Sequence, residues 1–122
     1  MKNLFRIFVL ALCGLVGTTF ADDFKSLVIP ANTASDTIRV RGDQFMLIRN
    51  FTQEDGTIHG VVMVNKPPGT TPAVNVLAAA ILNMSTLEVI SSVVIAGPAD
   101  VTIMCGSDAT GSCFISYKKA DN

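Results

Sequence analysis

Short apolar runs separated by turn-forming residues fill the chain after residue 21. The runs are rich in β-branched and aromatic residues, and several alternate apolar and polar positions with the period of two that is typical of a half-buried strand. This spacing predicts an all-β fold, a single antiparallel β-sandwich of about seven or eight strands with Greek-key or jelly-roll-like connections. The strands are expected at 26–29, 37–40, 45–51, 57–64, 101–105 and 113–117. In the third of these, Met46, Ile48 and Asn50 are expected to share one face.

Turn chemistry supports these strand limits. Pro30 ends the first strand, and the tripeptide Arg-Gly-Asp at 41–43 is expected to turn the chain. The segment 54–56, Glu-Asp-Gly, is the strongest hairpin signal, because Asp and Gly tolerate the positive φ that primed turns require. We expect it to lead directly into the strand at 57–64. The segment 65–69 contains two prolines, which cannot donate to a ladder, so it is expected to be a loop.

The segment 73–83 fits two kinds of secondary structure. Thr71 and Pro72 could cap and open a helix, since apolar residues then recur at helical spacing along the segment. The same residues also alternate as a strand that is buried on both faces. A turn at 83–86 would then pair this strand with 88–96. The all-β surroundings favour the strand, and the helix stays open as the alternative.

Residues 1–21 have the three-part pattern of a cleavable secretory signal peptide. A basic start is followed by the apolar run 7–16, and Ala21 closes a small-x-small end. We expect cleavage between Ala21 and Asp22, which leaves 22–122 as a single β-sandwich domain. The mature protein would then be secreted, to an extracellular or periplasmic location.

Two other roles of this N-terminal segment fit less well. A retained transmembrane helix needs roughly 20 apolar residues and the run is about half as long, so we expect no membrane span in the mature chain. A lipidated Cys13 would need a small residue before it, where the chain has Leu12. Cys13 is therefore expected to leave with the signal peptide.

Cleavage leaves two cysteines, Cys105 and Cys113. An even number of cysteines in an exported chain favours a disulfide, and closing a loop of about nine residues would contribute roughly 2.5 kcal/mol. The segment 106–112 is expected to join two paired strands, so that the bond crosses a strand pair. A zinc site is disfavoured because His59 is the only histidine that the chain contains.

Charge and composition exclude several partners. The whole chain has a net charge of −1, and removal of Lys2 and Arg6 with the signal peptide makes the mature domain about −3. The chain has no Trp, one Tyr and no cluster of Lys and Arg, so nucleic acid is not an expected partner. No cofactor is expected either, because the sequence contains no nucleotide-binding loop.

Few residues carry recognisable chemistry. His59 has no nucleophile-elbow motif to act with, and the adjacent acids Glu54 and Asp55 diverge in a tight turn instead of forming a glycosidase pair. Asp100 and Asp108 could contact calcium from neighbouring loops, but the chain lacks a ligand-dense loop of the EF-hand kind. We therefore assign no catalytic or metal-binding residue and expect a protein that is not an enzyme.

Two short motifs have plain structural explanations. The Arg-Gly-Asp at 41–43 matches the tripeptide that integrins recognise, but a solvated turn explains the same residues. Asn50 and Asn83 open N-glycosylation sequons, which matter only in a eukaryotic host. Otherwise Asn50 ends a strand and Asn83 begins a turn.

Charge is scarce in the middle of the chain, where only three residues between positions 56 and 106 are charged. Strands this apolar exceed what the inner faces of one small sandwich absorb, and exposed apolar patches usually mark a partner. We therefore expect an exported structural or interaction protein that forms a homo-oligomer through the apolar region 57–96. The alternative is a binding module that uses loops 65–72 and 106–112 to hold a sugar, a small molecule or a protein ligand.

Overall fold

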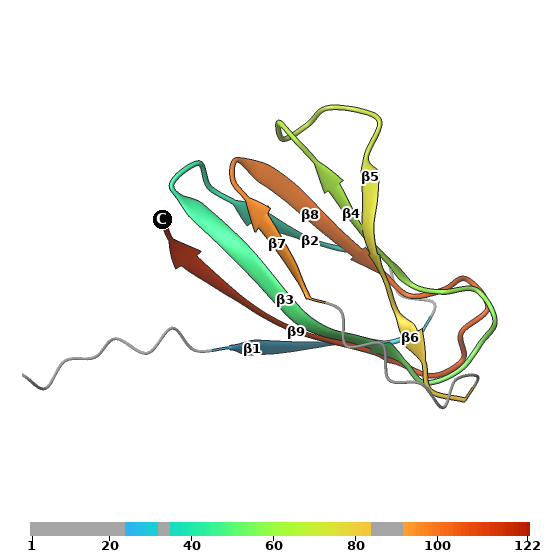
Figure 1. Cartoon of the computed structure of the whole chain (residues 1–122). Coiled ribbons are helices and arrows are strands. Elements are labelled where there is room, and N and C mark those ends of the chain that lie inside the picture. Colours follow the sequence, from blue (N-terminus) through green and yellow to red (C-terminus); the bar gives the residue numbers. More distant parts are fainter. Residues whose placement is uncertain (1–23, 32–34, 84–91) are drawn as a thin grey trace, which may run out of the picture.

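Two β-sheets packed face to face make up the protein (Figure 1). The computed structural model describes residues 24–31, 35–83 and 92–122, and these contain no helix. The expected all-β sandwich is therefore confirmed. The described residues form the strands β1 (Lys25–Ile29), β2 (Asp36–Val40), β3 (Gln44–Gln53), β4 (Val61–Asn65), β5 (Val74–Ala78), β6 (Ala80–Ile81), β7 (Val93–Ala96), β8 (Ala99–Met104) and β9 (Cys113–Asp121).

Each sheet has its own strand order. In sheet A the order is β1-β9-β3-β6, with β7 also beside β3, and in sheet B it is β2-β8-β4-β5. The pairs are antiparallel except for β3 with β6, a short parallel contact of Thr52 with Ala80 and of Gln53 with Ile81. The core lies between the sheets and includes the fully buried Val40, Met46, Ile48, Val62, Val101, Ile103 and Ile115.

Most consecutive strands lie in different sheets. β2 leads to β3, β3 to β4 and β8 to β9 across the sandwich, and among the described residues only β4 and β5 are consecutive and hydrogen-bonded to each other. The hairpins expected at 54–56 and 106–112 are therefore wrong. Each connection is long enough to span the roughly 10 Å between packed sheets. The two strands that it joins therefore lie in different sheets, on opposite sides of the core. Gly56 does adopt the expected positive φ, 98°, but within a crossing between layers.

A bulge in β3 decides which of its side chains enter the core. The register with β9 shifts between Ile48 and Asn50. Met46 and Ile48 are buried, Asn50 is exposed, and beyond the bulge Phe51 and Gln53 are buried again. The expected common face of Met46, Ile48 and Asn50 is wrong because one extra residue reverses the alternation. The bulge thereby directs a polar residue, Gln53, into the interior.

The segment 73–83 is extended, so the strand is confirmed and the helix is wrong. It is not buried on both faces, because β5 is the edge of sheet B and leaves Val74 62% exposed. At Ala79 the chain crosses to sheet A, and the Ala79 amide donates to the carbonyl oxygen of Gly60 (2.8 Å). The expected pairing with 88–96 is also wrong, since β7 pairs with β3.

Several expectations concern residues that the structure does not describe. Residues 1–23 include the signal peptide with its cleavage site between Ala21 and Asp22, and 84–91 include most of the turn expected at 83–86. Both stay predictions. Within the described ranges, no helix has the length and apolar character needed to cross a membrane.

Candidate functional site

The side-chain amide of Gln53 joins two connections that lie side by side at one end of the sandwich (Figure 1). This side chain is fully buried. Its Nε2 donates to the carbonyl oxygens of Asp55 (2.7 Å) and Ile58 (3.0 Å). Its Oε1 accepts from the amides of Gly60 (2.8 Å) and Gly106 (3.0 Å). Every hydrogen-bonding position of the amide is therefore occupied by the backbone, which makes Gln53 a structural group.

Asp108 binds the connection 54–60 through its carboxylate. It accepts from the Thr57 amide (2.8 Å), from Thr57 Oγ1 (2.6 Å) and from the Ile58 amide (2.9 Å). Hydrogen bonds to a carboxylate favour its ionised form, so the pKa of Asp108 is lowered, with the Thr57 hydroxyl as the largest cause. The side chain is thus committed to holding a neighbouring loop.

Asp55 makes the reciprocal contact with the segment 106–112. Its carboxylate accepts from the amides of Thr110 (2.8 Å) and Gly111 (2.9 Å) and from Thr110 Oγ1. The pKa of Asp55 is lowered as well, chiefly by the Gly111 amide and then by Thr110. We refer to the following group as the loop clamp: Gln53, Asp55, Thr57, Asp108 and Thr110.

Cys105 and Cys113 close the same end of the sandwich. Their sulfur atoms lie at disulfide distance, with the Cα atoms 5.8 Å apart. The two cysteines lie together as expected, but they connect the two sheets instead of two paired strands. The reason is that Cys105 follows β8 in sheet B, whereas Cys113 begins β9 in sheet A.

The remaining candidate residues are not brought together into one site. His59 lies in the connection before β4, not in a strand, and its Nδ1 is 2.7 Å from the carbonyl oxygen of Ala79. Asp100 pairs with Arg39 near the start of β8, whereas Asp108 follows the end of that strand, so the two cannot share a calcium ion. In 24–31, 35–83 and 92–122, no group of three or more His, Cys, Asp or Glu side chains could hold a metal ion.

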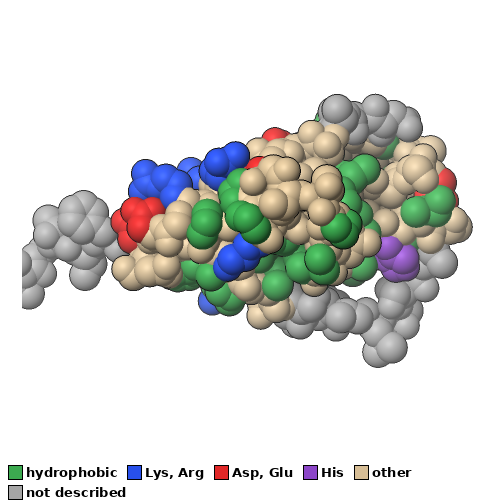
Figure 2. All heavy atoms as spheres, turned by 90° about the horizontal axis from the view of Figure 1, so that it is seen from above, with side chains coloured by type: hydrophobic (Ala, Val, Ile, Leu, Met, Phe, Trp, Pro, Cys, Tyr) green, Lys and Arg blue, Asp and Glu red, His purple; other side chains and the backbone are tan. Residues whose placement is uncertain are grey.

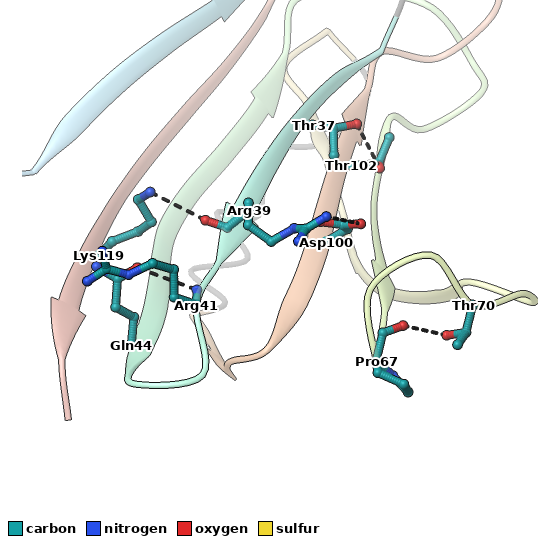
Figure 3. Close-up of polar contacts among 9 residues, drawn as sticks. All are labelled: Thr37, Arg39, Arg41, Gln44, Pro67, Thr70, Asp100, Thr102 and Lys119. Carbon is teal, nitrogen blue, oxygen red and sulfur yellow. Dashed lines mark hydrogen bonds and ion pairs between the residues drawn. The ribbon is translucent and has the colours of Figure 1, made fainter.

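The tripeptide at 41–43 is an exposed turn, as expected. Arg41 Nε and Nη2 lie 3.3 and 3.4 Å from the carboxylate oxygens of Asp43, so the two charges pair with each other instead of pointing apart. The Arg41 amide donates to Gln44 Oε1 at 3.4 Å and holds the turn (Figure 3). Seen from above, basic and acidic side chains lie beside one another at this end of the molecule (Figure 2).

The loops 65–72 and 106–112 lie at opposite ends of the sandwich (Figure 1). One follows β4 and the other follows β8, and these two strands pair antiparallel. Loop 65–72 is also closed by its own polar groups, since Thr70 Oγ1 donates to the carbonyl oxygen of Pro67 (2.6 Å) (Figure 3). A sugar or a small molecule therefore cannot contact both loops at once.

The strands β5, β6 and β7, which belong to the described part of the region 57–96, lie along one side of the sandwich. β5 is the edge of sheet B and β6 the edge of sheet A, and they are separated by one residue, Ala79. β7 continues the edge of sheet A along β3. Three side chains of this region are among the most exposed large hydrophobic residues described: Val74 at 62%, Leu82 at 61% and Val94 at 63%.

The edges of the sandwich differ in charge. On one side, β1 begins with Lys25 and β2 contains Asp36 and Arg39. On the other side, β5, β6 and β7 contain no charged residue. Because charged side chains on edge strands oppose pairing with another chain, the side that contains β5, β6 and β7 is the candidate interaction surface.

The two sequon asparagines lie on the surface. Asn50 is exposed in β3, and Asn83 is exposed after β6, although the rest of the second sequon lies outside the described residues.

The sequence did not single out three residues of the loop clamp: Gln53, Thr57 and Thr110. The one available signal was a glutamine directly before a turn-forming segment. No protein-family profile, curated protein or solved structure matches the chain.

Proposed function

We propose that the chain is an exported, non-enzymatic structural or interaction protein that self-associates through the region 57–96. The observation that carries the proposal is that the edge strands on one side of the sandwich, β5, β6 and β7, contain no charged residue. An edge strand exposes unpaired backbone N–H and C=O groups that pair readily with another chain, and natural proteins commonly block such edges with charge. Charged residues are present on β1 and β2 and absent from the strands β5, β6 and β7 on the opposite side.

Exposed apolar side chains strengthen the case for this side. Val74 and Val94 are both more than half exposed, one on the edge of each sheet. Burying a Val or Leu side chain contributes about 1.5–3 kcal/mol relative to leaving it in water. Pairing between copies would therefore gain backbone hydrogen bonds and apolar burial together.

β5 is the edge at which we expect the first contact between copies. Lys66, in the connection between β4 and β5, donates from Nζ to the carbonyl oxygen of Ala96 (3.0 Å). This acceptor at the end of β7 is therefore already occupied and is not open to a second copy. β5 spans Val74–Ala78 and is longer than either β6 or β7. A second copy would add to sheet B along this strand.

Light scattering coupled to size exclusion tests the proposal over a concentration series. The wild-type protein should exceed the monomer mass at micromolar concentration, whereas Val74→Lys and Val94→Lys should shift it toward the monomer. Val28→Lys is the matched control, because Val28 is 59% exposed on β1, at the far edge of sheet A. A wild-type protein that stays monomeric at high micromolar concentration contradicts self-association. Equal effects of all three substitutions contradict the choice of surface.

Export is tested separately by mass spectrometry of protein recovered after expression of the whole chain. We expect a mature N-terminus at Asp22 and a mass two protons below that of the reduced chain, because Cys105 and Cys113 would be oxidised outside the cytosol. Recovery of the chain with Met1 attached and both thiols free would contradict export.

The alternative of a ligand-binding module loses support from the geometry. The loops 65–72 and 106–112 are separated by the length of the sandwich, and the second is occupied by the loop clamp. A binding module would need a separate site on one loop.

A further inference from the structure

Lysine side chains protect two of the edge strands. Lys119 of β9 reaches from sheet A to β2 of sheet B, where its Nζ donates to the carbonyl oxygen of Arg39 (3.4 Å) (Figure 3). Lys66 Nζ occupies the carbonyl oxygen of Ala96 at the end of β7 in the same way. Lysines that cover an edge are a common protection against pairing with another chain. A second copy would therefore meet an ammonium group at either of these edges.

β5 offers a second copy an edge of a different kind. It spans five residues, and none of them is charged. β1 begins with Lys25, β2 contains Asp36 and Arg39, and β6 has only two residues. Among the described edges, β5 therefore matches the β5 strand of a second copy better than any other strand in length and charge. A contact between the same strands of two copies is isologous, and such a contact closes at a dimer.

The faces of β5 decide how two copies of it can pair. Val74 lies opposite Val64 of β4, whose side chain packs against the core. Val76 packs against the core as well. Asn75 lies between these two valines, is exposed, and points to the outer side of sheet B. The strand thus has an apolar side and a polar side on which Asn75 is central.

A two-fold axis through Asn75 keeps each of these side chains on its own face. Opposite residues of antiparallel strands share a face of the sheet. The Asn75 side chains of the two copies then face each other, and Val74 of each copy faces Val76 of the other. An axis through Val76 would instead set Asn75 against Leu77. Leu77 lies opposite the fully buried Val62 and therefore points to the core side, so that register mixes the faces.

The side chains at this axis are complementary to themselves. A carboxamide both donates and accepts, so two Asn75 side chains can bond to each other across the axis. Val74, which is 62% exposed in the single chain, would be covered by Val76 of the other copy. We propose that two copies pair β5 with β5 about a two-fold axis through Asn75, which joins their two B sheets into one continuous sheet and closes a dimer. This proposal rests on self-association through the region 57–96 and adds its partner strand, register and symmetry.

Opposite charges introduced at Asn75 test the axis. Asn75→Lys and Asn75→Asp each place like charges opposite one another, and each should raise the dissociation constant of the dimer roughly 10-fold or more. An equal mixture of the two variants sets opposite charges against each other. It should form a mixed dimer with a dissociation constant within about threefold of that of the wild type. Native mass spectrometry identifies the mixed dimer by its mass, and light scattering over a concentration series gives the dissociation constants.

Thr37→Lys and Thr37→Asp are the matched controls, because Thr37 is exposed on β2, the other edge of sheet B. Both should dimerise as the wild type does, alone and mixed. Undiminished association of either Asn75 variant alone, a mixture that stays monomeric, or a wild-type mass that grows beyond the dimer would overturn the two-fold axis and leave self-association standing. A wild-type protein that is monomeric throughout the series would overturn both.

Discussion

Asp55 and Asp108 each bind the loop that carries the other carboxylate. Asp108 accepts from the amide of Thr57, two residues after Asp55, and Asp55 accepts from the amide of Thr110, two residues after Asp108. The two loops therefore bind each other through the same kind of hydrogen bond, although they are about fifty residues apart in sequence. Because each half fixes both loops, losing either carboxylate is expected to loosen the whole end of the sandwich.

Acid should weaken the fold through these two carboxylates. Both pKa values are lowered from the ordinary 3.8 by hydrogen bonds that exist only in the folded state. The unfolded chain then binds more protons at acidic pH, so this contribution to the free energy of unfolding is complete above the ordinary pKa and is lost as the pH falls through the lowered values. Thermal unfolding followed by circular dichroism should show Tm falling steeply below about pH 4.

Asp108→Asn separates this effect from general acid denaturation. The amide keeps the shape of the side chain but replaces one accepting oxygen by a donor. That donor faces the amide N–H of either Thr57 or Ile58, because the two amides bind different oxygens of Asp108. We expect Tm to drop by several degrees at neutral pH and to depend less on pH than in the wild type. The control is Asp36→Asn, an exposed aspartate of β2. A pH profile of Asp108→Asn parallel to that of the wild type would argue against the clamp as the acid-sensitive group.

Replacing Gln53 should destabilise the protein far more than replacing Gln44, a half-buried glutamine. Gln53→Leu removes the partners of the Gly60 and Gly106 amides and leaves these buried groups without a hydrogen bond. Each such group costs about 1–3 kcal/mol, so a loss of roughly 3–5 kcal/mol in the free energy of unfolding is expected. Urea unfolding measures it, with Gln44→Leu as the control, since Gln44 is only half-buried and its side chain makes two long contacts, with the Arg41 amide and with Asp121 (both 3.4 Å). Similar losses in the two variants would contradict the role given to Gln53.

Local patterns predicted where the strands lie but not how they pair. The expected strands at 26–29 and 37–40 agree with β1 and β2 to within one residue. Alternation of apolar residues reports which side chains face a core, because it depends only on the period of the strand. Alternation does not report which sheet a strand joins. The sequence therefore predicted hairpins after Gln53 and after Met104, where the chain in fact crosses to the other sheet.

The loop clamp could not be predicted because its partners are distant in sequence. Thr57 and Asp108 are 51 positions apart, and no short pattern connects them. Gln53 faces the core only because the bulge near Arg49 reverses the alternation of β3. Alternation from Met46 alone would have placed Gln53 on the outer face.

The close packing of Gly106 against the backbone gives a sharp test of the loop geometry. A Cβ at this position would lie 1.7 Å from the carbonyl oxygen of Ile58, which cannot move without disturbing the bonds of Gln53. Gly106→Ala should therefore cost about 3 kcal/mol or more. Gly42→Ala is the control, because a Cβ there would have its nearest neighbour, in Pro98, at an ordinary 3.8 Å. Unfolding of Gly106→Ala at the wild-type urea midpoint would refute the described approach of the two loops.

Reduction should destabilise the same end of the molecule. A bond between Cys105 and Cys113 closes a loop of about nine residues, and its loss is expected to cost roughly 2.5 kcal/mol through the entropy of the unfolded chain. It would also release the connection between sheet A and sheet B beside Gln53, whose Oε1 lies 3.6 Å from Cys113 Sγ. Urea unfolding with and without dithiothreitol measures the effect. The control is Cys105→Ala/Cys113→Ala, whose midpoint should not respond to the reductant. If wild type and this variant respond alike, no bond joins the two sulfurs, and the end of the sandwich is held by the loop clamp alone.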